Sequence, residues 1–218
     1  MGRDNHPRAR QKQKLERKKA KRASYDRILI VCEGEKTEPQ YFEEIRQFHR
    51  LQTANVVILP SSYGTSPQQV VNFARYKLNE SLEWEQVFCV FDRDVHPNFD
   101  NALKSAAALD RKFNNEVGEP IRFFAIPSDP CFELWLLLHF YCITHEIDRK
   151  KIIQMLRKDY LPNYEKSQKG CFLLTHSRLP TAFKNAKVLT KNRNSNKNEN
   201  PHTAVGDLVK ILTELSNR

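Results

Sequence analysis

The chain has 218 residues, of which 39% are hydrophobic and 28% are charged. This length suits one domain of moderate size with extensions, and no apolar run approaches the roughly 20 residues of a membrane span. The basic N-terminus leads into no apolar segment, which argues against a signal peptide. The five cysteines form no CxxC or Cys/His cluster, which argues against a zinc site. We therefore expect a cytoplasmic protein that makes no use of a membrane.

Most of the net charge of +10 lies at the N-terminus, where residues 1–22 hold ten Lys or Arg against two acidic residues. The segment has almost no apolar side chains, so residues 1–23 are predicted to form a basic flexible arm. Such an arm binds nucleic acid or keeps the protein soluble. Its candidate nucleic-acid contacts are Arg8, Arg10, Lys12, Lys14, Arg17, Lys18, Lys19, Lys21 and Arg22.

Strand and helix patterns alternate after the arm. Short apolar runs rich in β-branched residues predict strands at 27–32, 55–59, 86–91 and 121–126. Helices are predicted between them, beginning at a Thr37-x-x-Gln40 capping box, at Ser66-Pro67 and near Asn98. This alternation predicts an α/β domain over residues 24–145, with a parallel sheet flanked by helices.

A C-terminal helical extension is predicted over residues 146–218. Before it, Asp129-Pro130 is expected to open a helix that reads CFELWLLLHFYC, which is apolar on nearly every side and therefore buried. Further helices are expected over 148–158, over 180–189 and after Asn200-Pro201, with a polar loop over 191–200.

Acidic residues follow two of the predicted strands. Glu33 comes directly after the first strand, and Asp92 and Asp94 come after the third. Parallel sheets of this kind bind ligands at the carboxyl ends of their strands. Three carboxylates gathered there repel one another unless a cation lies among them, and hard oxygen ligands suit Mg²⁺ or Mn²⁺. We therefore predict that Glu33, Asp92 and Asp94 hold a divalent metal ion.

Other polar residues near these motifs have two interpretations each. Glu38 is either a metal ligand or a first-turn acid favoured by the helix dipole. Glu133, in the buried helix, is expected to be paired or bound to metal. Lys36 is either solvated or in contact with a phosphate. His139 is expected to pack within its helix, whereas His176 is a candidate phosphate contact.

Four motifs resemble the RloB-like family: CEGEKTEPQYF (32–42), FDRD (91–94), PSDPCFELWLLLHF (127–140) and NPHTAVGDLV (200–209). The Glu-Gly and Asp-x-Asp motifs also resemble the Toprim domain of topoisomerases, bacterial primases and several nucleases. A tyrosine-bearing topoisomerase domain and a primase zinc domain are both missing from the sequence, which argues against those two activities.

The resemblance implies a Toprim nuclease that cuts RNA, tRNA in particular, or DNA, with Mg²⁺ or Mn²⁺ held by Glu33, Asp92 and Asp94. It makes Glu38 and Glu133 further candidate ligands, and Lys36 and Arg93 candidates to offset the charge of the scissile phosphate. It also implies an effector of antiphage defence and abortive infection that works with an ABC-type ATPase. The alternative is a non-catalytic nucleic-acid-binding module whose acidic residues are structural.

Overall fold

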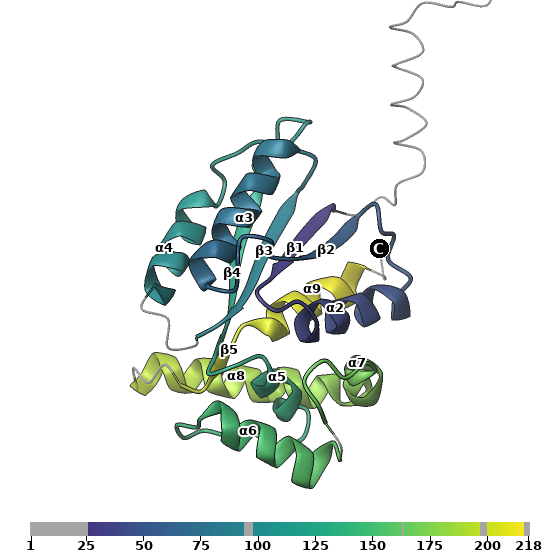
Figure 1. The fold of residues 1–218 in the computed structure, drawn as a ribbon, viewed down its shortest axis with the longest axis vertical. Coiled ribbons are helices and arrows are strands. Elements are labelled where there is room, and N and C mark those ends of the chain that lie inside the picture. The colour runs from purple at the N-terminus through teal and green to yellow at the C-terminus, as the bar shows by residue number, and fades with distance from the viewer. Residues whose placement is uncertain (1–25, 94–97, 163, 197–199, 216–218) are drawn as a thin grey trace, which may run out of the picture.

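A mixed, five-stranded sheet forms the centre of the molecule, as the computed structural model of residues 26–93, 98–162, 164–196 and 200–215 shows (Figure 1). The order across the sheet is β2-β1-β3-β4-β5, with β1 to β4 parallel and β5 antiparallel to β4. This confirms the predicted α/β class. The strands are β1 (Ile28–Cys32), β2 (Val56–Pro60), β3 (Gln86–Asp92), β4 (Arg122–Asp129) and β5 (His202–Thr203).

Helices cover both faces of the sheet. The cluster around Leu29 and Val31 packs against α3 and α4, and the larger cluster around Ile28 and Ile30 includes residues of α2, α5, α8 and α9 (Figure 1). The two faces of β1 thus enter different cores, which explains its unbroken apolar run. The helices are α2 (Thr37–Phe48), α3 (Pro67–Glu80), α4 (Phe99–Leu109), α5 (Glu133–Leu138), α6 (Arg149–Met155), α7 (Cys171–Thr175), α8 (Leu179–Asn196) and α9 (Val205–Leu215).

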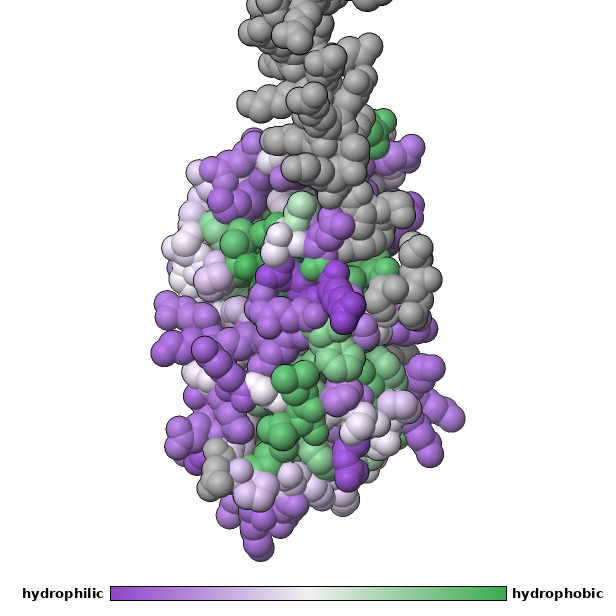
Figure 2. Space-filling model, turned by 90° about the vertical axis from the view of Figure 1, so that its right-hand side faces the viewer, coloured by the Kyte–Doolittle hydropathy of each residue, from purple (hydrophilic) through white to green (hydrophobic). Residues whose placement is uncertain are grey.

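Two short helical turns follow α6 and α7. A π-helical turn (Leu156–Tyr160) follows α6 and a 3₁₀ turn (His176–Arg178) follows α7. On the face shown in Figure 2, hydrophobic side chains lie in patches between hydrophilic ones. Within the described ranges, no helix is both long and apolar enough to cross a membrane.

Several predicted helix starts differ from the structure. Ser66 forms the expected capping box with Gln69, but α2 begins at Thr37 itself, with Lys36 in the cap position and no side-chain cap. Asp129 is the last residue of β4 and does not cap a helix. Its carboxylate accepts hydrogen bonds from Arg93 and Asn200, partners too distant in sequence to be foreseen.

The C-terminal segment differs from its prediction in two places. The predicted loop over 191–200 is helical as far as Asn196, because extending a helix already packed in the core requires no new nucleation. The two-residue strand β5 was not predicted, since so short a segment has no periodicity. Its Thr203 hydroxyl lies 2.9 Å from that of Ser128 on β4. The C-terminal segment therefore contributes to the central sheet, while the division at residue 145 stays a prediction.

The apolar helix α5 is buried on all sides, as its sequence predicted. Its six residues are at most 2% exposed, and the Trp135 indole donates a 2.7 Å hydrogen bond to the Tyr41 hydroxyl of α2. The His139 ring follows directly, with Nδ1 2.9 Å from the Trp135 carbonyl oxygen. His139 is thus packed in the core, as expected, although it lies at the C-cap of α5 and not within the helix.

The buried His139 should make the fold sensitive to acid. Burial lowers its pKa from 6.5 to about 4, so the unfolded chain binds more protons between these values and stability falls as the pH drops from 6.5 to 4. We expect this group to contribute a loss of about 3 kcal/mol over that range. Urea unfolding of His139→Gln should show a shallower pH dependence than the wild type. The same change at the exposed His145 should leave the pH dependence unaltered.

Candidate functional site

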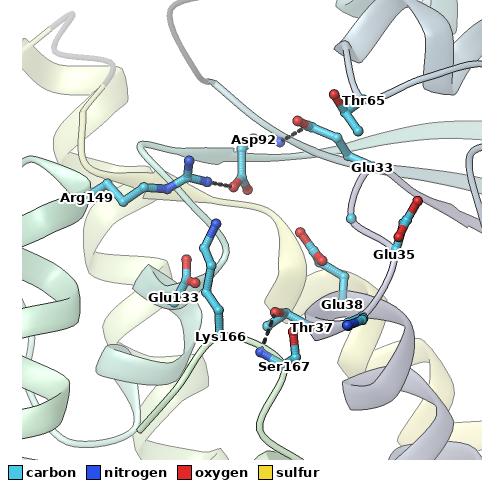
Figure 3. Close-up of a pocket in the computed structure, with 12 residues that line it drawn as sticks. Glu33, Glu35, Thr37, Glu38, Thr65, Asp92, Glu133, Arg149, Lys166 and Ser167 are labelled. Carbon is cyan, nitrogen blue, oxygen red and sulfur yellow. Dashed lines mark hydrogen bonds and ion pairs between the residues drawn. The ribbon is translucent and has the colours of Figure 1, made fainter.

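A pocket of about 370 Å³ lies at the carboxyl ends of β1 and β3 (Figure 3). Five carboxylates and three cationic side chains line it, a formal net charge of −2. The lining residues are Glu33, Gly34, Glu35, Lys36, Thr37, Glu38, Thr65, Asp92, Glu133, Arg149, Lys166 and Ser167.

The parallel pairing of β1 and β3 brings Glu33 and Asp92 together. Cys32 is in register with Val90, so the next residue, Glu33, leaves the sheet beside the end of β3. The Glu33 backbone N–H donates to the Val90 carbonyl, and its Oε2 accepts a 2.9 Å hydrogen bond from the Asp92 backbone N–H. These two acidic residues therefore converge as the sequence suggested, although through a backbone contact.

Asp92 is buried, with 5% of its surface exposed. One carboxylate oxygen forms a close ion pair with the Arg149 guanidinium of α6 (Figure 3). Burial nevertheless raises the pKa of the Asp92 carboxyl well above its usual range; the charge of Glu38 raises it further, while Arg149 lowers it. A single guanidinium thus offsets part of the unfavourable environment of this carboxylate.

Glu38 and Glu133 face the same pocket from α2 and α5, and both are buried. Burial raises the pKa of Glu38, as does the neighbouring Glu133, whereas Lys166 opposes the increase. The Tyr164 hydroxyl donates to Glu133 over 3.4 Å. A Cβ atom at Gly34 would lie 2.1 Å from Glu38 Oε2, so the glycine of the Glu-Gly motif leaves room for the Glu38 carboxylate.

The other predicted residues have different surroundings. Lys36 is exposed at the rim of the pocket. Arg93 pairs with Asp129 at 3.3 Å and lies over the Phe99 ring. The His176 ring packs against Phe48 and does not line the pocket. Outside the described residues lie Asp94 and the arm residues Arg8, Arg10, Lys12, Lys14, Arg17, Lys18, Lys19, Lys21 and Arg22.

Two cations in the pocket were missed by the sequence analysis. Arg149 begins α6 and Lys166 lies in the loop before α7, more than 50 residues from the acidic motifs. The Ser167 backbone N–H donates a 3.2 Å hydrogen bond to the Thr37 hydroxyl oxygen, and this bond connects the loop to the start of α2 (Figure 3). Arg149 stands among other basic residues in the sequence, so nothing there distinguished it.

The pocket suits a divalent metal in its donor chemistry. Glu33, Glu38, Asp92 and Glu133 supply an all-oxygen set, which Mg²⁺ and Mn²⁺ prefer. Burial, together with the neighbouring carboxylates, raises the pKa of Asp92 and of Glu38, and a bound cation would favour the charged form of both groups. Across the described residues, however, no group of three or more His, Cys, Asp or Glu is already gathered for metal binding. The Asp92 oxygen that pairs with Arg149 would contact an ion only if this pair opened.

A family model described as RloB-like protein matches residues 28–212. The chain belongs to the RloB-like family. No curated protein and no solved structure matches it. The match to this RloB-like chain spans the pocket residues Glu33, Asp92, Glu133, Arg149 and Lys166.

Removing the Arg149 charge should destabilise the protein at neutral pH, because Asp92 would then be buried without its cation. Loss of one partner of a buried pair typically costs about 3 kcal/mol. We expect Arg149→Gln to lose about that amount in urea unfolding at pH 7 with EDTA. Asp92→Asn/Arg149→Gln should recover most of the loss, and Lys150→Gln, on the exposed side of the same helix, should have no effect. Equal stability of Arg149→Gln and the wild type would contradict the ion pair.

Proposed function

We propose that this RloB-like protein is a metal-dependent nuclease of the Toprim type, which hydrolyses phosphodiester bonds in RNA, tRNA in particular, or in DNA. The observation that supports this most is that four carboxylates, from the ends of β1 and β3 and from α2 and α5, line one pocket at the carboxyl edge of the sheet. These residues are Glu33, Glu38, Asp92 and Glu133. Such sheet edges are the usual ligand sites of α/β folds.

In this proposal the four carboxylates, with Asp94, hold one or two Mg²⁺ or Mn²⁺ ions. When bound, the metal supplies a water of lowered pKa and neutralises charge on the leaving oxygen. The cationic side chains at the pocket, Lys36, Arg149 and Lys166, would orient the scissile phosphate and offset its charge. Arg149 is already held inside the pocket by its ion pair with Asp92, so it needs little displacement to meet a phosphate.

The biological setting is proposed from the family resemblance. Membership of the RloB-like family leads us to propose an effector of antiphage defence and abortive infection, controlled by an ABC-type ATPase partner. The basic arm over residues 1–23 would add affinity for nucleic acid without reading its sequence.

A second candidate function is a non-catalytic nucleic-acid-binding module. The ion pair between Asp92 and Arg149 favours it, because an aspartate satisfied by a guanidinium serves a structural role without any metal. In this alternative the protein has no metal-dependent activity, and substituting Asp92 changes only its stability.

Metal-dependent cleavage separates the two functions. We expect the purified protein to cut tRNA or plasmid DNA in Mg²⁺ or Mn²⁺ and to lose at least about 100-fold in rate when Asp92→Asn or Glu33→Gln removes a ligand charge. Asp159→Asn, at an exposed position outside the pocket, should cut at the wild-type rate. Cutting that survives Asp92→Asn would refute the metal assignment.

Metal affinity gives an independent measurement. Calorimetric titration should show that Mn²⁺ binds to the wild type and to Asp159→Asn with the same affinity. The affinity of Asp92→Asn for Mn²⁺ should be lower by at least about tenfold. Metal binding without cutting would point to the proposed control by a partner, whereas neither binding nor cutting would favour the non-catalytic module.

The arm can be tested by the salt dependence of binding. If it engages about six phosphates, affinity should fall by about 10³ or more between 50 and 200 mM salt. Deleting residues 1–23 should weaken binding at 50 mM salt and flatten this dependence, as should a full-length variant with arm lysines and arginines changed to glutamine. Unchanged affinity at low salt in both variants would remove the proposed role of the arm.

A further inference from the structure

An exposed aromatic cluster, formed by Tyr63, Phe73 and Tyr76, lies outside the acidic pocket. The Tyr63 ring centroid is 5.3 Å from that of Phe73 and 5.6 Å from that of Tyr76, and the Phe73 and Tyr76 rings are stacked at an interplanar angle of 16°. Phe73 is buried, whereas Tyr63 and Tyr76 are 44% and 42% exposed. Two tyrosine rings thus sit on a buried aromatic base with much of their surface free.

The cluster lies next to the pocket along the chain. Tyr63 belongs to the segment that joins β2 to α3 and precedes Thr65 by two positions. Thr65 lines the pocket (Figure 3). Two residues of extended chain span about 7 Å at most. The backbone that carries Tyr63 therefore leads directly to the pocket at Thr65.

The segment that carries Tyr63 has a defined conformation. Gly64 has φ of +117°, and a Cβ atom there would lie 2.6 Å from the Gln69 side chain. Gln69 in turn forms the capping box with Ser66. A glycine that tolerates positive φ and a closed cap together hold Tyr63 over α3.

The second exposed ring is also held in place and lies beside a cation. The Tyr76 hydroxyl donates a 2.7 Å hydrogen bond to Glu80 Oε1, and Lys77 Nζ donates a 2.7 Å hydrogen bond to Glu80 Oε2. Lys77 Nζ lies 5.5 Å from the Phe73 centroid and 5.6 Å from the Tyr76 centroid, and Arg75 is exposed on the same helix. Rings fixed beforehand lose little entropy when a flat ligand stacks on them, and the cations complement phosphates.

We propose that Tyr63 and Tyr76 form a stacking site for unpaired nucleobases, so that the protein takes a single-stranded segment of nucleic acid into its pocket. The inference rests on the proposed function, because that function supplies the nucleic-acid substrate. Exposed aromatic rings beside cations are the usual means by which proteins bind single strands. Bases inside a duplex present their edges and keep their faces stacked on one another, so this site selects loops, ends and open strands.

The composition of the cluster favours a base over an apolar protein partner. Both exposed side chains are tyrosines, and the charges around them are Lys77, Arg75 and Glu80. A flat ring with a cation alongside suits a π ligand attached to a phosphate. Self-association through the cluster is the competing outcome in the test below.

The test compares binding of oligonucleotides with and without bases. Fluorescence anisotropy of the full-length protein in EDTA would use labelled oligo-dT, an abasic strand of equal length and a blunt duplex. We expect the wild type to bind oligo-dT more tightly than the abasic strand. Tyr63→Leu/Tyr76→Leu should weaken oligo-dT binding by about fivefold or more and leave abasic binding unchanged. Tyr141→Leu, at another exposed tyrosine, is the matched control.

Two further measurements keep the result unambiguous. Tyr63→Trp should retain affinity, and its fluorescence should be quenched by oligo-dT but not by the abasic strand. Sedimentation should show the same oligomeric state for the wild type and the double leucine variant. The proposal would be overturned if the wild type and the double leucine variant bound oligo-dT equally, or if the variant lost as much affinity for the abasic strand as for oligo-dT. It would also be overturned if the wild type bound no oligo-dT, or if the variant changed its oligomeric state. Because EDTA removes metal, a failure of cleavage leaves this result unaffected.

Discussion

The ion pair between Asp92 and Arg149 connects the chemistry of the pocket to the fold. Asp92 ends the central strand β3, where burial disfavours its charge and the nearby Glu38 adds to that cost. The compensating guanidinium comes from α6, 57 positions further along the chain. Removing one charge of such a pair leaves the other buried alone. The C-terminal helices are therefore part of the electrostatic balance of the sheet edge, and the pocket is complete when both parts of the chain are folded.

A second polar network lies at the carboxyl end of β3. Arg93 contacts Asp129 at the end of β4, and the same carboxylate accepts a 2.9 Å hydrogen bond from Asn200. Asn200 also bonds both backbone groups of Ile147. Three of the family motifs thus meet in one network, those containing Arg93, Asp129 and Asn200. Their polar residues connect the carboxyl ends of β3 and β4 to the segment before β5. This gives these motifs a structural role in addition to any chemical one.

The sequence was informative where the determinant was local. Apolar periodicity placed the four parallel strands within a few residues, and the capping residues Ser66 and Gln69 placed the start of α3. The convergence of Glu33 with Asp92 followed from the geometry of parallel strands. Residues that act across long separations were not visible: Asp129 resembled a helix cap until Arg93 and Asn200 were placed beside it. Arg149 and Lys166 could not be found for the same reason, since their partners are defined by tertiary packing alone.

The charge of the pocket bears on how the proposed function would operate. With a formal charge of −2, the pocket could be neutralised by one divalent ion, and a phosphate arriving with it would then find Arg149 and Lys166 as its partners. Under the proposed function, the cost of separating Arg149 from Asp92 is offset when the ion meets the carboxylate and the phosphate meets the guanidinium. If metal binding opened this ion pair, metal and substrate would each favour binding of the other, because linkage is reciprocal. Under the proposed function, such a pocket would bind metal most tightly when nucleic acid is present.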